Sequence, residues 1–324
     1  MANRLGLGLI PGAGWRAAEI RAVAREAEEA GFDAVVAAEV NNDALATTFL
    51  MGEATRQIKV GTWIASIHMR HSYACAKAAD LIADATGGRM ILGLGMSHRP
   101  VNAALGAEMP SPVAALRRYT TEVAGWLRGE GPVTHLPQQP APVPVPIYLA
   151  AMTSPTVELA GELADGVMPF MWSAERIARS KVWAARGRAK APRRAPLDIA
   201  HGIPTFIGDD IGAQREAARA NLALFTTFPF YQRMFRASGF AEEAEKAEAG
   251  AGGASLSDRM LDAICLIGPV SRCRGSSRPS APPGSICRSC PHRSASTAHA
   301  RSYARSGVEP ILPGLRREAA LLDQ

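Results

Sequence analysis

The stretch that decides the fold runs from Arg89 to Pro100 and reads RMILGLGMSHRP. Its apolar run, Met90 to Leu92, is bounded by glycines, which is typical of a parallel strand that is covered on both faces. The glycines allow a sharp turn and the close approach of another group. The polar tip Ser97-His98-Arg99 follows directly, where α/β enzymes place their sites. An ordinary strand-to-helix turn has the same pattern, so the interpretation depends on the rest of the chain.

The alternation of strand and helix extends over most of the chain. Short apolar runs alternate with segments that have apolar residues at helical spacing, and the connections are short. This order predicts an α/β fold with a parallel sheet and right-handed crossovers. No GxGxxG motif follows the first strand, so a (β/α)8 TIM barrel fits the 324 residues better than a dinucleotide-binding fold. We expect strands over 5–10, 32–38, 58–65, 90–95, 146–151, 167–171 and 197–207, and helices over 17–30, 45–55, 72–86, 114–128, 156–163, 209–225 and 228–239, with another helix starting at 172.

Composition and charge limit the location and the partners that we expect. The start of the chain, Met1-Ala2-Asn3-Arg4, does not read as a signal peptide, and no apolar run is long enough to span a membrane. We therefore expect a cytoplasmic protein. The net charge is +6, and seven arginines with no acidic residue fall between 272 and 305. Such a basic segment can bind nucleic acid or anionic lipid, but nothing else supports that role, and we expect neither nucleic acid nor membrane as a partner.

The cysteines cluster toward the carboxyl end of the sequence. Cys287 and Cys290 have metal-type spacing, and His292 is near them. A structural zinc site needs four ligands. Cys273 is a candidate for the fourth, but nothing else in the sequence supports the site, so we expect no metal.

Several motifs, taken in this order and spacing, resemble the luciferase-like monooxygenase superfamily, and the branch resembled is that of the oxidoreductases that use coenzyme F420, a deazaflavin. The resemblance covers about residues 1–270. One departure is Arg70-His71-Ser72, where the family usually has Arg-His-Pro. The other motifs are Gly31-Phe32-Asp33, Gly61-Thr62-Trp63-Ile64-Ala65, Thr86-Gly87-Gly88-Arg89 before Leu92-Gly93-Leu94-Gly95, Ser97-His98-Arg99-Pro100, and Pro146-Ile147-Tyr148-Leu149-Ala150-Ala151 before Ala160-Gly161-Glu162-Leu163-Ala164-Asp165-Gly166.

The resemblance implies a (β/α)8 barrel that binds its cofactor at the carboxyl ends of the strands. Glu39 would lie near the cofactor ring at the end of the second strand. Ile64 and Ala65 would form a bulge in the third strand, often with a non-prolyl cis peptide that supports the ring. The residues along the ring and ribityl chain would be Gly95, Met96, Ser97 and His98.

The phosphate would be held by Ala151, Met152, Thr153 and Ser154, at the start of a helix. This assignment also has a physical reason, because the free backbone N–H groups and the positive end of a helix favour an anion. A plain helix cap at Thr153 and Ser154 remains the alternative interpretation.

The expected chemistry depends on His98. Some relatives have an acid–His pair at the end of the second strand, where the histidine acts as a general base; here the pair is Glu39-Val40, so that base is absent. His98 becomes the candidate catalytic residue, since the pKa of histidine suits proton transfer near neutrality. The alternative is a hydrogen bond from His98 to the cofactor without chemistry. We expect His71 to orient its loop and His68 to face the substrate.

The resemblance therefore implies an enzyme that moves a hydride between coenzyme F420 and a small organic substrate, at a CH–OH or a C=C group, and that forms a homodimer. The first alternative is an FMN-dependent luciferase-like monooxygenase. The second is a non-catalytic or damaged flavin-binding barrel, which the valine at position 40 favours.

The last part of the sequence differs from the rest. We expect a barrel domain over 1–270 and an irregular tail over 271–324, because the tail is rich in Ser, Pro and Arg and has no periodicity. This tail replaces the last helix and strand of the barrel. A frameshift explains it, since the same bases shifted by one can encode an amphipathic helix and a buried strand. We expect a barrel that lacks its last strand to be less stable.

Overall fold

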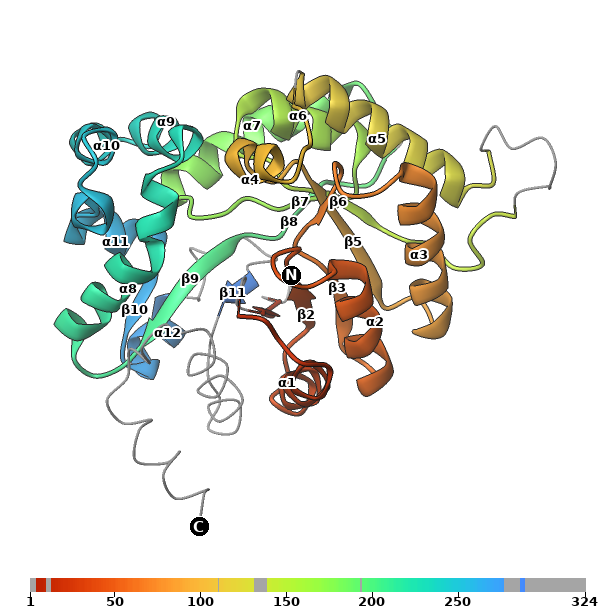
Figure 1. Ribbon diagram of the computed structural model, residues 1–324, viewed down its shortest axis with the longest axis horizontal. Coiled ribbons are helices and arrows are strands. Elements are labelled where there is room, and N and C mark those ends of the chain that lie inside the picture. Colours follow the sequence, from red (N-terminus) through yellow and green to blue (C-terminus); the bar gives the residue numbers. More distant parts are fainter. Residues whose placement is uncertain are drawn as a thin grey trace, which may run out of the picture. The chain divides into compact units, whose positions relative to one another are not determined.

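The computed structural model describes residues 4–9, 13–109, 111–130, 139–192, 194–276 and 286–288 (Figure 1). The chain divides into two compact units. Of the described residues, the N-terminal unit contains 5–150 and 163–165, and the C-terminal unit contains 4, 151–162 and 166–288.

The N-terminal unit has a parallel sheet whose centre is β5 (Met90–Gly95), the strand from which the sequence analysis began. Met90, Leu92 and Leu94 are fully buried, as expected for a strand covered on both faces. The strands pair in the order β1-β2-β3-β5-β6, with β4 beside β5, and each of these pairs is parallel. Their bounds are β1 Gly6–Gly8, β2 Ala34–Ala37, β3 Lys59–Thr62, β4 Ala65–Ser66 and β6 Ile147–Leu149.

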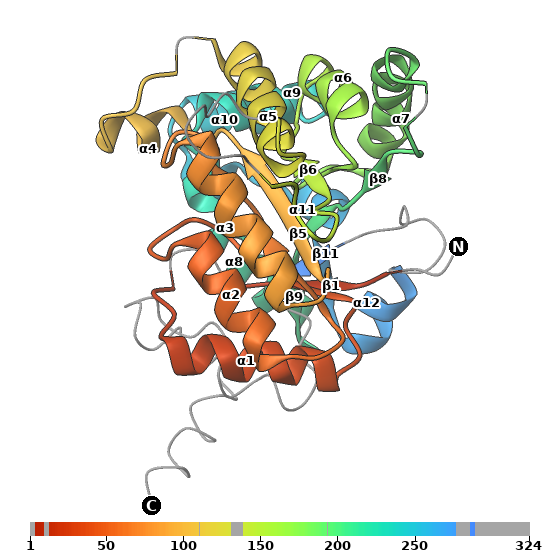
Figure 2. The same cartoon turned by 90° about the vertical axis from the view of Figure 1, so that its right-hand side faces the viewer.

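The helices of the N-terminal unit follow its strands. Helices α1, α2 and α3 lie side by side against the sheet (Figures 1 and 2). Asp43 caps α2 by accepting the N–H of Ala46, and His71 caps α3 by accepting the N–H of Tyr73, so His71 does orient its loop. Helix α4 was not predicted; it starts at the polar tip of β5 and has Pro100 in its first turn. The bounds are α1 Ala17–Glu29, α2 Ala44–Ala54, α3 Ser72–Ala85, α4 Arg99–Ala104 and α5 Pro112–Leu127.

Two charged side chains hold the loops at the amino-terminal ends of these strands. The Glu28 carboxylate accepts the backbone N–H groups of Arg56, Gln57 and Ile58 at 2.6–3.1 Å. The Arg89 guanidinium donates to four carbonyl oxygens and to the Thr55 hydroxyl, all within 3.0 Å. Both groups satisfy backbone polar atoms that turns otherwise leave unpaired.

The C-terminal unit also combines parallel strands with helices. Strand β7 pairs with β8, and β9 pairs with both β10 and β11. Its strands are β7 Gly166–Val167, β8 Asp198–Ile199, β9 Gly202–Ile207, β10 Leu266–Gly268 and β11 Ile286–Arg288. Its helices are α6 Ser154–Leu163, α7 Ala174–Ala189, α8 Ile211–Thr226, α9 Pro229–Ala237, α10 Ala241–Glu248, α11 Asp258–Ile264 and α12 Val270–Ser276, with a 3-10 turn at Gly252–Ser255; Leu163 itself is counted with the N-terminal unit.

Two expectations about strand bounds need correction. The strand expected over 58–65 is interrupted at Trp63-Ile64, and the strand expected over 197–207 is two strands, β8 and β9. The irregular tail expected from 271 contains most of α12 and all of β11. Pro269 suits the start of α12, and residues 286–288 contain no proline, so their backbone can pair with β9. The rest of the tail, with the frameshift hypothesis, lies outside the described residues.

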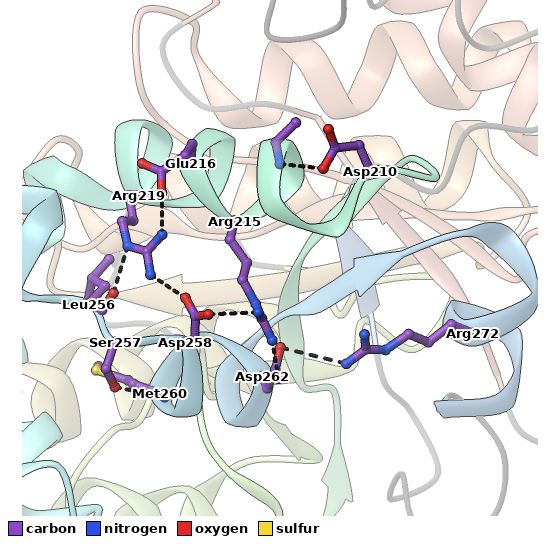
Figure 3. Close-up of polar contacts among 11 residues, drawn as sticks. Asp210, Arg215, Glu216, Arg219, Leu256, Ser257, Asp258, Met260, Asp262 and Arg272 are labelled. Carbon is purple, nitrogen blue, oxygen red and sulfur yellow. Dashed lines mark hydrogen bonds and ion pairs between the residues drawn. The ribbon is translucent and has the colours of Figure 1, made fainter.

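A chain of ion pairs joins α12 to α11 and α8 within the C-terminal unit (Figure 3). Arg272 lies 3.7 Å from Asp262, which pairs with Arg215 at 2.7 Å. Arg215 also pairs with Asp258 at 2.7 Å, and Asp258 pairs with Arg219. Positive and negative groups alternate along the chain, so each carboxylate has two cationic neighbours.

Within the part of the chain that the structure describes, no helix has both the length and the apolar character that crossing a membrane requires.

Candidate cofactor site

Unusual backbone conformations mark the carboxyl ends of three strands. Among the described residues, the non-glycine residues with positive φ are Asn41, Ser97 and Met171, at 59°, 56° and 53°. They follow β2, β5 and β7 respectively. L-residues rarely adopt this left-handed conformation, and it is frequent at functional sites. The carboxyl ends of the strands are therefore the candidate site, in each unit separately.

Glu39 connects the ends of β2 and β4 in the N-terminal unit. Its Oε2 accepts the backbone N–H of Ser66 at 2.5 Å, and its own N–H donates to the carbonyl of Ile64 at 3.3 Å. Its Oε1 is paired with the Arg70 guanidinium. Both side chains are largely buried, at 12% and 15% exposure. Glu39 lies at the strand end where it was expected, but its carboxylate is occupied by protein donors.

Ile64 and Ala65, expected as a bulge of the third strand, lie where that strand is interrupted between β3 and β4. The peptide bond between Trp63 and Ile64 is cis, directly before this pair. Gly95 lies against them, because a Cβ added to Gly95 would be 2.7 Å from Cγ1 of Ile64 and 3.0 Å from Cβ of Ala150. Glycine at position 95 was expected to allow the close approach of another group, and the Ile64 side chain fills that space.

The residues after β5 are held by Asn102 of α4, which is fully buried. Its Nδ2 donates to the carbonyl of Met96 at 2.7 Å, and its backbone N–H donates to the carbonyl of His98 at 2.9 Å. Met96, Ser97 and His98 are half-buried. Burial lowers the pKa of the His98 imidazole below its ordinary value of 6.5, so this ring is neutral at pH 7 and can accept a proton.

Several buried polar atoms of the N-terminal unit have no hydrogen-bond partner among the residues that the structure describes. They are Asn42 Oδ1, His68 Nε2, Arg70 Nε, Asn102 Oδ1 and Thr120 Oγ1. Buried polar groups in native proteins are nearly always paired, with protein, water or ligand. The pyrimidine edge of a flavin or deazaflavin carries both donors and acceptors, so this set of atoms fits such a group.

The four residues expected at the phosphate lie together in the C-terminal unit, where Ala151, Met152 and Thr153 lead into α6. The hydroxyl groups of Thr153 and Ser154 already have partners. The Thr153 and Thr156 hydroxyl oxygens are 3.0 Å apart, and the Ser154 hydroxyl donates to Glu158 at 3.0 Å. Any anion at this helix end would therefore bind first-turn backbone N–H groups, to which Pro155 contributes none.

Four residues of these strand ends were not foreseen as functional. Arg70 stood in a motif used only to recognise the family, and Asn102 carried no signal. Arg176 and His201 are buried in the C-terminal unit. His201 Nε2 accepts the backbone N–H of Trp172 at 3.1 Å, and burial lowers its pKa to about 3. The one available signal was Ser173, which caps α7 and therefore places Arg176 in its first turn.

Within the described residues, no group of three or more His, Cys, Asp or Glu side chains could hold a metal ion. Cys75, Cys265 and Cys273 are buried free thiols. The side chains of Cys287, Cys290 and His292 lie outside the described part.

Parallel strands alternate with helices, and polar residues lie at the carboxyl ends of the strands, where α/β enzymes have their sites. The sequence model of the luciferase-like monooxygenase family matches residues 4–278, and the chain belongs to that family. A putative coenzyme F420-dependent oxidoreductase of Mycobacterium tuberculosis is 31% identical over 230 residues, which span 61% of this chain and 65% of that protein.

Solved structures support the fold. The coenzyme F420-dependent tetrahydromethanopterin reductase of Methanopyrus kandleri superimposes with a TM-score of 0.72 at 19% identity, covering 89% of this chain and 93% of that one. The oxygenating constituent of 3,6-diketocamphane monooxygenase of Pseudomonas putida, in complex with FMN, gives 0.63 at 14% identity, covering 96% and 99%. The predicted fold class, the luciferase-like (β/α)8 barrel, is confirmed by these similarities.

Proposed function

We propose that the protein is an F420-dependent oxidoreductase that moves a hydride between the deazaflavin and a small organic substrate. The observation that carries the proposal is the set of buried polar atoms in the N-terminal unit that have no hydrogen-bond partner among the described residues. The similarity to a relative named as F420-dependent favours the deazaflavin over FMN.

In this proposal the protein mainly positions the cofactor, which supplies the hydride chemistry when bound. Glu39 and Arg70 hold the ends of β2 and β4 in a fixed register. The neutral His98 imidazole accepts or returns the substrate proton. His68 Nε2, which has no partner among the described residues, is available to a polar group of the substrate.

A reduced-FMN monooxygenase is the second candidate, because a fold neighbour binds FMN. The two functions differ in their use of oxygen, since a deazaflavin does not activate it. Oxygen consumption during turnover supports the monooxygenase, and equal turnover without oxygen supports the hydride transfer.

The first test is equilibrium binding of F420 and of FMN to the purified protein, followed by quenching of tryptophan fluorescence. We expect micromolar binding of F420 and weaker binding of FMN. Ser97→Val should weaken binding, because a β-branched residue disfavours the left-handed conformation of Ser97. The control is Leu81→Ser on the exposed face of α3. Preference for FMN would favour the monooxygenase, and binding of neither would favour a non-catalytic barrel.

The proposal includes a cytoplasmic homodimer that acts on a small molecule. Light scattering after size-exclusion chromatography measures the mass directly, and a monomer at micromolar concentration contradicts the dimer.

A further inference from the structure

The junction between the β4–α3 loop and α3 departs from the family pattern at one position. It reads Arg70-His71-Ser72, and the family usually has a proline where this chain has Ser72. A proline at the first residue of a helix fixes φ and stiffens the junction of loop and helix. With serine at position 72, the chain lacks this restraint.

Helix α5 holds the same junction through two side chains. The Tyr119 hydroxyl donates to the carbonyl of Arg70 at 3.1 Å, and the Ser72 hydroxyl donates to Oε2 of Glu122 at 2.7 Å. Tyr119 and Glu122 are three residues apart, so they lie on the same face of α5. Two hydrogen bonds from one helix face therefore bracket His71, the N-cap of α3.

Both hydrogen bonds are sheltered from water. Tyr119 is 8% exposed and Ser72 is 2% exposed. Burial raises the pKa of the Tyr119 hydroxyl above its ordinary value of 10, so this hydroxyl is protonated near neutral pH and remains a donor. Without it, the carbonyl of Arg70 would lose its side-chain donor, and an unpaired acceptor away from water is costly.

The loop carries His68, whose Nε2 is buried and has no partner among the described residues. The backbone N–H groups of His68 and Met69 donate to the Ser66 hydroxyl and carbonyl, each at 3.3 Å. These distances are long for hydrogen bonds, so local contacts restrain the middle of the loop only weakly. The orientation of the His68 ring therefore depends on how the two ends of the loop are held.

The two ends of the loop are held differently. At the first end, the N–H of Ile67 donates to the carbonyl of Gly95 at 2.9 Å. At the other end, the Arg70 guanidinium pairs with Glu39, but it does so at the tip of a long side chain. The hydroxyl of Tyr119 holds the backbone of Arg70 itself, so α5 has the more direct control over the loop.

The backbone at position 72 would also accept the proline of the family. His71 has φ −64° and ψ 144°, which is the extended conformation that a residue before proline prefers. Ser72 is the first residue of α3, where proline is favoured. The hydrogen bonds from α5 and a proline at position 72 are therefore alternative ways to stiffen the same junction.

We propose that Tyr119 and Glu122 form a clamp on Arg70 and Ser72, which replaces the rigidity of the family proline and positions His68 for a polar group of the substrate. Tyr119 is a positioning residue that acts through the backbone of Arg70. The contact of His68 with substrate rests on the proposed function, whereas the hold of the clamp on His68 does not.

The test is an NMR titration of the histidine rings in the full chain without cofactor, with the His68 signal assigned by His68→Gln. Burial alone lowers the pKa of His68 below 6.5, so this pKa reports how far water reaches the ring. The double variant Tyr119→Phe/Ser72→Ala should move the pKa of His68 at least halfway to 6.5. The double variant Tyr119→Phe/Ser72→Pro should bring most of this change back.

Two controls separate the clamp from a general loosening. Tyr73→Phe also removes a hydroxyl near α5, since the Tyr73 ring lies 5.0 Å from that of Trp126, and it should leave the pKa of His68 unchanged. The pKa of His98, on the loop after β5, should stay the same in every sample.

The inference is wrong if His68 titrates alike in the wild type and in Tyr119→Phe/Ser72→Ala. It is also wrong if proline at position 72 restores nothing relative to alanine, or if His98 shifts as much as His68. Should the double variants not fold, Tyr119→Phe alone, which keeps the ring, decides by the same titration.

Turnover with F420 gives a second arm. Tyr119→Phe/Ser72→Ala should raise KM for the substrate by about tenfold and change kcat by less than about twofold, because a binding hydrogen bond is weakened. Tyr119→Phe/Ser72→Pro should restore KM. A fall in kcat at unchanged KM would contradict the role of His68 in binding. If no substrate is turned over, the proposed function fails, and the titration still decides whether the clamp positions His68.

Discussion

Glu39 illustrates how a single residue can occupy its expected place with a different role. The resemblance placed it near a cofactor ring, and it does lie past the end of β2. Its two carboxylate oxygens, however, bind Ser66 and Arg70. The carboxylate therefore links two strand ends, and its cationic partner Arg70 also pairs with Asp43 at 3.2 Å.

We predict that Arg70→Met lowers the free energy of unfolding by roughly 2 kcal/mol, below the 3–5 kcal/mol of a fully buried pair because both side chains retain some exposure. The loss comes from leaving Glu39 charged and unpaired. Urea unfolding measures it. In a double-mutant cycle with Glu39→Gln, the second substitution should cost much less in the Arg70→Met background than alone. Additive losses would show that the pair is not coupled.

His98 gives a prediction that separates its two expected roles. If it transfers the proton, His98→Asn should lower kcat/KM by roughly 100-fold and leave the dissociation constant of the cofactor unchanged. Since burial lowers the pKa of His98 below 6.5, the neutral form should persist at pH 7, and kcat/KM of the wild type should fall only in more acidic solution. The variant should lack this acidic limb. A weaker cofactor affinity at unchanged kcat would assign His98 to binding instead.

At the scale of elements, Glu28 at the end of α1 holds the turn between α2 and β3. Burial tends to raise the pKa of its carboxyl, but the N–H groups of Ile58, Gln57 and Arg56 and the charge of Arg89 lower it below 4.5 overall. A folded-state pKa below that of the unfolded chain stabilises the fold at higher pH, and this contribution is lost as the pH falls through the folded value.

We therefore predict that Glu28→Gln costs about 1 kcal/mol at pH 7. The difference from the wild type should shrink as the pH falls below 4.5 and through the lowered pKa of Glu28. Chemical unfolding at a series of pH values measures it, with Glu29→Gln on the same helix end as the control. A difference that does not change with pH would mean that the charge of Glu28 has no part in holding the turn.

The ion pairs of α8, α11 and α12 give a prediction that depends on salt (Figure 3). Asp258 bridges Arg215 and Arg219 from the first residue of α11, where a negative charge also suits the helix dipole. Asp258→Asn should cost about 0.5–1 kcal/mol at low salt, as exposed pairs do. The cost should fall between about 0.05 M and about 1 M NaCl. Glu216→Gln, which is more exposed and pairs only with Arg219, should cost less. A cost that is independent of salt would contradict the electrostatic origin.

The sequence predicted elements better than it predicted residue roles. Helix ends carried local signals, such as Asp43, Ser173 and Asp210, each of which accepts a first-turn N–H as expected of a cap. The break in the third strand and the ion pair of Arg70 with Glu39 depend on contacts 27 to 31 residues apart. Periodicity contains no information on such contacts, and only the resemblance pointed to the break.

For the whole molecule, the family match covers residues 4–278. This range includes all the strands and helices that the periodicity of the sequence predicted. The tail was expected to be irregular, and the described part of it includes β11. Its composition argued against any regular element, yet a strand needs only a backbone that can pair, and residues 286–288 pair with β9 in parallel register.

The contribution of β11 is the last prediction. Cys287 is the central residue of the strand and stands opposite Ile203. A proline there removes an N–H and fixes φ, which a strand tolerates poorly. We expect Cys287→Pro in the full-length chain to lower the free energy of unfolding by roughly 1–3 kcal/mol, measured by urea unfolding, while the control Cys287→Ala, which keeps the backbone N–H, costs less. Equal midpoints for both variants and the wild type would mean that β11 adds nothing to the stability of β9, and a frameshifted, non-contributing tail would then be the better account of this part of the sequence.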